Sequence, residues 1–242
     1  MKILISGKGG CGKSTISALL SKEIARRRYQ VLVMDTDESN FGLHASLGVD
    51  SPEDFMNYFG GKEVLFERVE SLKGEWRTVD LPGQFVAEKN GVKLMIMGKI
   101  YDFGEGCACP INALSSRFLE RLELDEDEFL LADTDAGIEH LGRGVDRGAD
   151  LILVVVEPSQ ESIMLAKKIT EMGNEINKSV LYVLNKVNDK VKSFVSQSLD
   201  NSKILGFLPR NARISRYGLE GKELDFRLEE IEHVVDSLIE RG

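Results

Sequence analysis

Short apolar runs recur along the chain, and most are continuous rather than alternating between apolar and polar positions. Such continuity is typical of parallel strands that are buried on both faces. The pattern predicts strands over residues 2–6, 31–35, 93–98, 129–133, 151–157, 180–185 and 203–209.

Most segments between these runs carry apolar residues at helical spacing, so strands and helices alternate along the chain. This alternation predicts an α/β fold with a doubly wound, mainly parallel sheet flanked by helices. The apolar helix faces are Ile16, Leu19, Leu20 and Ile24; Ile163, Leu165, Ile169 and Met172; and Leu224, Leu228, Ile231, Val235, Leu238 and Ile239.

No Pro-, Ser- or Gly-rich linker divides the sequence, so we expect one domain over residues 1–242. The least regular region, residues 50–106, is expected to be an insertion that contains a hairpin turning at Asn90 and Gly91. This insertion leads to a Cys-x-Cys segment, Cys107 and Cys109, followed by a proline and an expected helix.

Composition narrows the classes of partner. The 242 residues are 42% hydrophobic and carry a formal net charge of −9, which argues against nucleic-acid and anionic-membrane partners. The N-terminal apolar stretch is too short for a signal peptide and no apolar run is long enough to span a membrane, so we expect a cytoplasmic protein. The three cysteines do not suggest a disulfide framework and favour metal or redox chemistry.

The segment GKGGCGKST, residues 7–15, matches the P-loop pattern between an expected strand and an expected helix. Backbone N–H groups of such a loop surround phosphate oxygens, Lys13 reaches the β- and γ-phosphates, and Ser14 offers a hydroxyl to Mg²⁺. The expected nucleotide contacts are Gly9, Gly10, Cys11, Gly12, Lys13, Ser14 and Thr15.

Lys8, directly after the first glycine, resembles the additional lysine in the deviant P-loop of the MinD, Mrp and nitrogenase-iron-protein group of ATPases. The resemblance implies an ATP-bound dimer in which this lysine reaches the phosphates of the other subunit, like an arginine finger. The alternative is that Lys8 only supplements the loop of its own chain.

Acidic residues at two expected strand ends fit the same group. The resemblance implies that Asp37 orients the attacking water and Asp35 supports the Mg²⁺ environment, with the first switch beginning at residues 38–40. It also implies that Asp133 holds Mg²⁺ through water and that the amide of Gly137 meets the γ-phosphate.

The chain departs from the MinD-like pattern at Asp135, where a proline is usual, and this affects the second switch. For the base, the resemblance implies that the Asn185 amide, next to Lys186, hydrogen-bonds the purine, and that Pro209 lines the other side of the adenine pocket. Asn188 stands where an aspartate would favour guanine, so ATP is expected rather than GTP.

Cys107 and Cys109, as thiolates, suit Zn²⁺, Ni²⁺ or Cu⁺ but supply only half of a tetrahedral site. Cys11 lies inside the P-loop and is a poor third ligand. The three histidines, His44, His140 and His233, have no ligand spacing with the pair, although His140 falls on the expected second switch. A second copy of the chain would complete a Cys₄ site on a two-fold axis. The alternative is that both cysteines are buried packing residues, but Gly104, Gly106 and Pro110 predict a loop.

Together, KGGCGKST, MDTDESN, GCACP and DTDAGIEHLGRG resemble the nickel-insertion accessory ATPases of carbon monoxide dehydrogenase, the CooC family. The resemblance implies an ATP-hydrolysing homodimer that holds one metal ion, Ni²⁺ or Zn²⁺, between the cysteine pairs and supplies nickel to carbon monoxide dehydrogenase. Two alternatives remain: an iron–sulfur carrier or reductase of the same fold, and a positioning or partition ATPase, which the acidic C-terminal segment disfavours.

Overall fold

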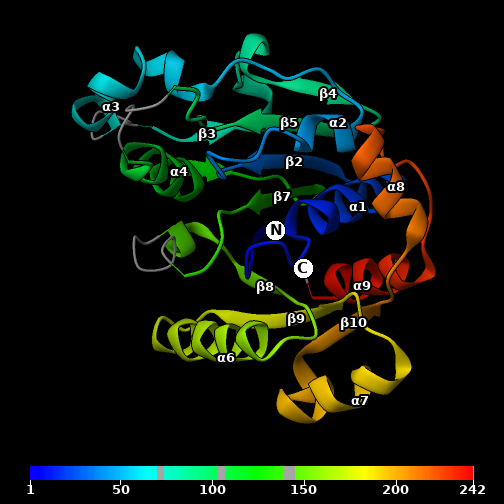
Figure 1. Cartoon of the computed structure of the whole chain (residues 1–242). Coiled ribbons are helices and arrows are strands. Elements are labelled where there is room, and N and C mark those ends of the chain that lie inside the picture. The colour runs from blue at the N-terminus through cyan, green and yellow to red at the C-terminus, as the bar shows by residue number, and fades with distance from the viewer. Residues whose placement is uncertain (70–73, 103–106, 139–144, 242) are drawn as a thin grey trace.

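The computed structural model describes residues 1–69, 74–102, 107–138 and 145–241. Its centre is an eight-stranded sheet in the order β10-β9-β8-β1-β7-β2-β5-β4 (Figure 1), and all neighbouring strands are parallel except β4 and β5. The predicted α/β fold is confirmed. The strands are β1 Lys2–Gly7, β2 Gln30–Asp35, β4 Ala87–Lys89, β5 Val92–Ile96, β7 Glu128–Asp133, β8 Leu151–Val156, β9 Ser179–Asn185 and β10 Ile204–Leu208.

Alternate residues of each strand face opposite sides of the sheet, which gives the molecule two apolar cores. Leu4 packs in one core, whereas its neighbours Ile3 and Ile5 pack in the other. Helices α3 Lys62–Val69, α4 Cys109–Arg121, α6 Gln160–Glu175 and α7 Asp189–Ser198 belong to the first side; α1 Lys13–Arg26, α2 Leu43–Leu47, α8 Ala212–Glu220 and α9 Glu229–Ile239 belong to the second (Figure 1).

The expected hairpin is present. Strands β4 and β5 pair antiparallel, and Asn90 and Gly91 both have positive φ, 53° and 80°. Two such residues form the primed turn whose twist matches the flanking strands.

The C-terminal helix is shorter than the apolar pattern predicts. It begins at Glu229, so Leu224 and Leu228 of the expected face lie before it. Leu228 has an extended conformation, and acidic residues occupy the first turn, where they stabilise a helix N-terminus. Leu224 is nevertheless buried in the same core as the helix.

The region between β2 and β5 is organised around an aromatic cluster. The fully buried ring of Phe55 contacts Tyr58, Phe59, Trp76, Phe85 and Phe118, with centroid distances of 5.3–5.7 Å. Because Phe118 belongs to α4, the cluster fixes this region against the helix that carries Cys109. A short parallel pair, β3 Trp76–Arg77 and β6 Leu122–Glu123, adds a second link. The short 3₁₀ helices are η1 Phe55–Phe59, η2 Thr78–Asp80, η3 Gly83–Phe85, η4 Val145–Gly148 and η5 Asn201–Lys203.

None of the helices in the described part of the chain combines the length and the apolar character that a bilayer crossing requires. Gly104 and Gly106, which predict the loop before the cysteines, and His140 lie outside the described residues.

Candidate functional site

The predicted P-loop connects β1 to α1 at the carboxyl edge of the sheet. Gly10 and Gly12 have φ of 75° and 101°, a region that favours glycine. A Cβ on Gly7 would lie 2.6 Å from the carbonyl oxygen of Val155, so the loop also packs too closely against β8 for a side chain there. Cys11 is fully buried, and burial raises the pKa of its thiol to about 11. The conformation of the loop is therefore fixed by its glycines and by its close packing against β8.

The loop opens into a cavity of about 570 Å³. Lys13 and Ser14 line it from the P-loop, Asp37 from the segment after β2, and Asp135 from the segment after β7. Three residues predicted for catalysis or metal binding, Lys13, Ser14 and Asp37, thus meet in one cavity.

Asp133, at the end of β7, lies fully buried beside this cavity. Its carboxylate accepts hydrogen bonds from Ser14 and from Ser17 (Oγ to Oδ1 3.0 Å), and burial raises its pKa to about 6. The amide of Asn40 also reaches this point, with Nδ2 2.9 Å from Ser14 Oγ and 3.4 Å from Asp133 Oδ2. The hydroxyl and carboxylate oxygens gathered here are the donor set that Mg²⁺ prefers.

Asp35, the last residue of β2, does not line this cavity. It is 1% exposed, and its Oδ2 lies 2.7 Å from Nζ of Lys99, a buried lysine that also donates to the carbonyl of Asp37 (2.6 Å). Burial raises the pKa of Asp35 to about 7, and the ammonium of Lys99 opposes this shift. Sequence reasoning missed Lys99, although a lysine just after an apolar strand was a signal that could have revealed it.

Lys8 is held by acidic side chains of its own chain. Its Nζ lies 3.4 Å from Glu157 and 3.1 Å from Glu161, and these carboxylates, Glu161 foremost, raise the pKa of Lys8. Glu157 also pairs with Lys186, 3.2 Å away, and Lys186 donates to the carbonyl of Gly10. Neither acidic residue was predicted as part of the site.

Gly137, the expected γ-phosphate contact, lies next to the P-loop. Its N–H donates to the carbonyl of Gly7 over 3.2 Å, and its φ is 96°. The segment after β7 is therefore hydrogen-bonded to the end of β1.

A second cavity, of about 390 Å³, contains the residues predicted for the base. Asn185, Lys186 and Pro209 line it together with Arg210, which was not predicted. The Asn185 amide donates to the carbonyl of Cys11 (2.8 Å), and its oxygen accepts from the N–H of Lys186 (2.9 Å). The Asn185 side chain therefore stabilises the conformation of the P-loop.

The two cysteines of the Cys-x-Cys segment lie at the N-terminus of α4. Cys107 is exposed and Cys109, half-buried, is the first residue of the helix. Hydrogen bonds from the Cys109 side chain and backbone lower the pKa of Cys107. The alternative that both cysteines are packing residues is therefore wrong for Cys107.

A cavity of about 410 Å³ adjoins Cys107 and is lined also by Met56, Lys62, Glu63, Tyr101 and Pro110. Nζ of Lys62 is buried without a hydrogen bond to any described residue, and its charge contributes to the lowered pKa of Cys107. Within the described ranges, no three or more His, Cys, Asp or Glu side chains gather in a metal-binding group. The pair therefore offers two ligands.

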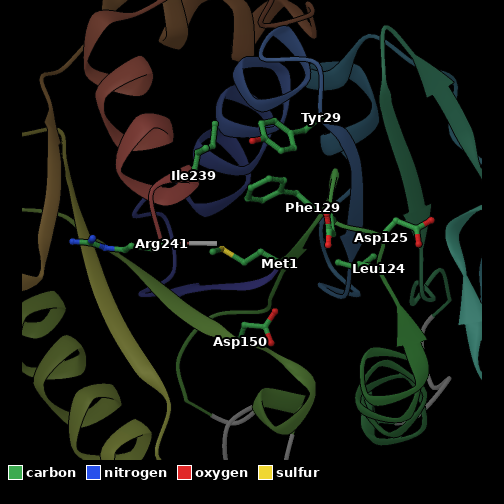
Figure 2. A pocket seen from close by; sticks show the side chains of 9 residues that line it. Met1, Tyr29, Leu124, Asp125, Phe129, Asp150, Ile239 and Arg241 are labelled. Carbon is green, nitrogen blue, oxygen red and sulfur yellow. The ribbon is translucent and has the colours of Figure 1, made fainter.

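A further cavity, of about 560 Å³, lies at the opposite edge of the sheet, near both ends of the chain. Met1, Tyr29, Phe129 and Ile239 form much of its wall, and Asp125, Asp150 and Arg241 lie at its margin (Figure 2). None of the predicted site residues lines it.

Comparison with known proteins agrees with this geometry. The CobQ/CobB/MinD/ParA nucleotide binding domain matches residues 2–224. The chain is 45% identical over 247 residues to an uncharacterized ATP-binding protein of Methanocaldococcus jannaschii, covering 98% of this chain and 99% of the relative. It is 31% identical over 225 residues to the carbon monoxide dehydrogenase accessory protein CooC of Rhodospirillum rubrum, covering 88% and 85%.

Among solved structures, the septum site-determining protein MinD of Pyrococcus horikoshii, complexed with Mg-ADP, superposes with a TM-score of 0.72 at 18% identity, covering 98% of this chain and 95% of that one. This likeness concerns the fold. The domain match over most of the sequence, with which the P-loop and the buried Asp133 agree, shows that the chain is a P-loop ATPase of the CobQ/CobB/MinD/ParA family.

Proposed function

We propose that this ATPase is a metallochaperone that holds Ni²⁺ or Zn²⁺ between the Cys107 and Cys109 thiolates of two copies of the chain. The observation that carries the proposal is the thiol pair itself, which lies at the N-terminus of α4. Cys107 is exposed, and its hydrogen bonds with Cys109 lower the pKa of its thiol. Thiolate is the form that binds such metals. The likeness to CooC over most of both chains supports this cargo.

The number of ligands supports a homodimer. Zn²⁺ in a structural site takes four ligands in a tetrahedron, and one chain brings two thiolates. An isologous contact around a two-fold axis would bring the same pair from the partner and close the site without a further residue type. The proposed metal site therefore lies between two chains.

The residues of the cavity of about 570 Å³ beside the P-loop would hold ATP with Mg²⁺. Lys13 and the loop N–H groups would bind the phosphates, while Ser14 and Asp133 would hold Mg²⁺, which supplies charge neutralisation for phosphoryl transfer. Asp35, whose carboxylate accepts a hydrogen bond from the N–H of Asp37 over 3.1 Å, would keep residues 35–37 (the Asp37 turn) in place, and Asp37 would orient the attacking water.

Lys8 would act across the dimer. To reach the phosphates of the other subunit, its ammonium would leave Glu157 and Glu161 of its own chain. Both partly exposed ion pairs are weak enough to be exchanged for a phosphate contact. The client proposed for the metal is carbon monoxide dehydrogenase, on the likeness to CooC, and the whole chain, residues 1–242, is proposed to act as one domain.

The test measures the metal bound per chain and the molecular mass of the protein in solution, with and without ATP. Both are measured for the unmodified protein and for the Cys107→Ser/Cys109→Ser variant. We expect about half a metal ion per chain in a dimer and none in the variant. One metal per monomer, retained in the variant, would overturn the proposal. The matched control is Cys11→Ser, which removes a buried thiol outside the proposed metal site and should leave metal binding without nucleotide unchanged.

Iron is a separate outcome of the same experiment. A visible absorption band after anaerobic reconstitution, with about four irons per dimer, would replace the proposed cargo by an iron–sulfur cluster.

A further inference from the structure

Lys99 occupies a place that ATP hydrolysis as proposed does not use. It follows β5, the neighbour of β2 in the sheet, and only 2% of its surface is exposed. A lysine is almost never this deeply buried unless it is paired. Its Nζ lies 2.7 Å from Asp35 Oδ2 and 2.6 Å from the Asp37 carbonyl, so one ammonium holds both ends of the turn that presents Asp37.

The backbone beside Lys99 is tied to the same turn and to the insertion. The N–H of Lys99 donates to Asp54 (2.9 Å), and the next N–H, of Ile100, donates to the carbonyl of Glu38 (3.2 Å). The hydroxyl of Tyr101 donates to the other oxygen of Asp54 over 3.1 Å. Residues 99–101 therefore form a hydrogen-bonded strap between the segment after β2 and residue 54.

The strap also borders the cavity beside Cys107. The Tyr101 ring packs on Phe41, with a centroid distance of 5.8 Å, and Phe41 follows the Asp37 turn. Tyr101 also lines the cavity that Cys107 lines. A series of contacts thus runs from the Asp37 turn through Lys99 to Tyr101, and Tyr101 and Cys107 line the same cavity.

We infer that Lys99 is a positioning residue that fixes the Asp37 turn for hydrolysis and, through the Lys99–Tyr101 strap, makes metal binding at the cysteine pair depend on the nucleotide. The first half stands on the ATPase alone, whereas the second rests on the proposed metal site. Any rearrangement of the Asp37 turn must move or break the Lys99 contacts, because interiors are too closely packed to absorb it locally.

The experiment compares Lys99→Met, which removes both Nζ contacts, with Lys99→Gln, which keeps a neutral donor. Lys93→Met, at the far end of β5, is the matched control. For Lys99→Met we expect kcat for ATP to fall about tenfold to 10²-fold with KM changed less than about threefold, since misplacement of a catalytic group acts mainly on kcat. Lys99→Gln should fall between Lys99→Met and the unmodified protein, and Lys93→Met should match the latter.

Coupling is measured as the ratio of Zn²⁺ affinities with ADP and with a non-hydrolysable ATP analogue, by competition with a chromophoric chelator. We expect a ratio of about fivefold or more in the unmodified protein and near unity in Lys99→Met, with the Zn²⁺ stoichiometry kept. The retained stoichiometry also shows that the variant folds; if Lys99→Met does not fold, Lys99→Gln takes its place.

An unchanged kcat in both Lys99 variants would overturn the positioning role, and an unchanged affinity ratio would overturn the coupling. If the unmodified protein binds no Zn²⁺ at its cysteines, the proposed metal cargo fails together with the coupling, while the kcat measurement still judges Lys99 by itself.

Discussion

The P-loop and the cysteine segment are both short loops before a helix, but they differ in completeness. The P-loop is fixed by glycines and by bonds from Asn185 and Lys186, and its cavity gathers Lys13, Ser14 and Asp37 from one chain. The cysteine segment presents an exposed thiol, and its two thiols are only half of the proposed metal site. The difference teaches that one chain gathers the residues of its P-loop cavity by itself, whereas the metal site proposed at its cysteines would need a second copy.

The largest expected effect concerns Lys8, the one residue of the ATP site that we propose to act on the other subunit. Lys8→Ala should lower kcat for ATP by about 10³-fold or more, because a residue that acts like an arginine finger stabilises the transition state. Nucleotide affinity of the monomer should change little. Steady-state hydrolysis and equilibrium binding of labelled ATP measure both quantities.

The control for this prediction is Lys168→Ala on α6, which removes an exposed lysine paired with Glu171. If Lys8→Ala hydrolyses ATP as fast as this control, Lys8 serves only its own loop.

The next effect tests what holds the cysteine segment in place. Phe55→Ala should lower the free energy of unfolding by about 3–5 kcal/mol, because it removes a fully buried ring at the centre of the aromatic cluster. Urea denaturation measures the change, and Phe55→Leu should cost clearly less. Equal costs for both variants would show that the cluster does not depend on the ring.

The third effect compares the thiols of the two regions directly. The pKa of Cys11 is raised to about 11, whereas that of Cys107 is lowered, so Cys107 forms its reactive thiolate at lower pH. At pH 7.5, Cys107 should be alkylated by iodoacetamide at least about 10²-fold faster than Cys11, and its rate should level off at lower pH. Mass spectrometry of labelled peptides gives both rates, and comparable rates would contradict the difference in environment.

The smallest expected effect concerns the charge beside the cysteines. A Cys₄ site with a divalent ion has net negative charge, and the Lys62 ammonium lies near Cys107. Lys62→Gln should weaken Zn²⁺ binding by about tenfold, as loss of a supporting group typically does. Lys62→Arg should retain most of the affinity; a Lys62→Gln variant with unchanged affinity would remove Lys62 from the site.

The sequence predicts these two regions unequally. Continuous apolar runs predicted the strands, the P-loop pattern predicted the positions of Lys13 and Ser14, and the resemblance of MDTDESN to the MinD group pointed to Asp37, since all three signals are local. The Lys99 contacts with Asp35 and Asp37 join residues more than sixty positions apart, and strand adjacency, which brings them together, has no local signature. The aromatic cluster was missed for the same reason, because Phe55 and Phe118 meet only through the tertiary fold.

The central claim is that the cysteine pair is half of a metal site shared by two chains. X-ray absorption at the zinc edge, on the Zn²⁺-loaded protein purified as a dimer with ATP, tests it most directly. We predict four sulfur ligands at about 2.3 Å, two from each chain. Two sulfur ligands with two nitrogen or oxygen ligands, unchanged in a monomer, would contradict it.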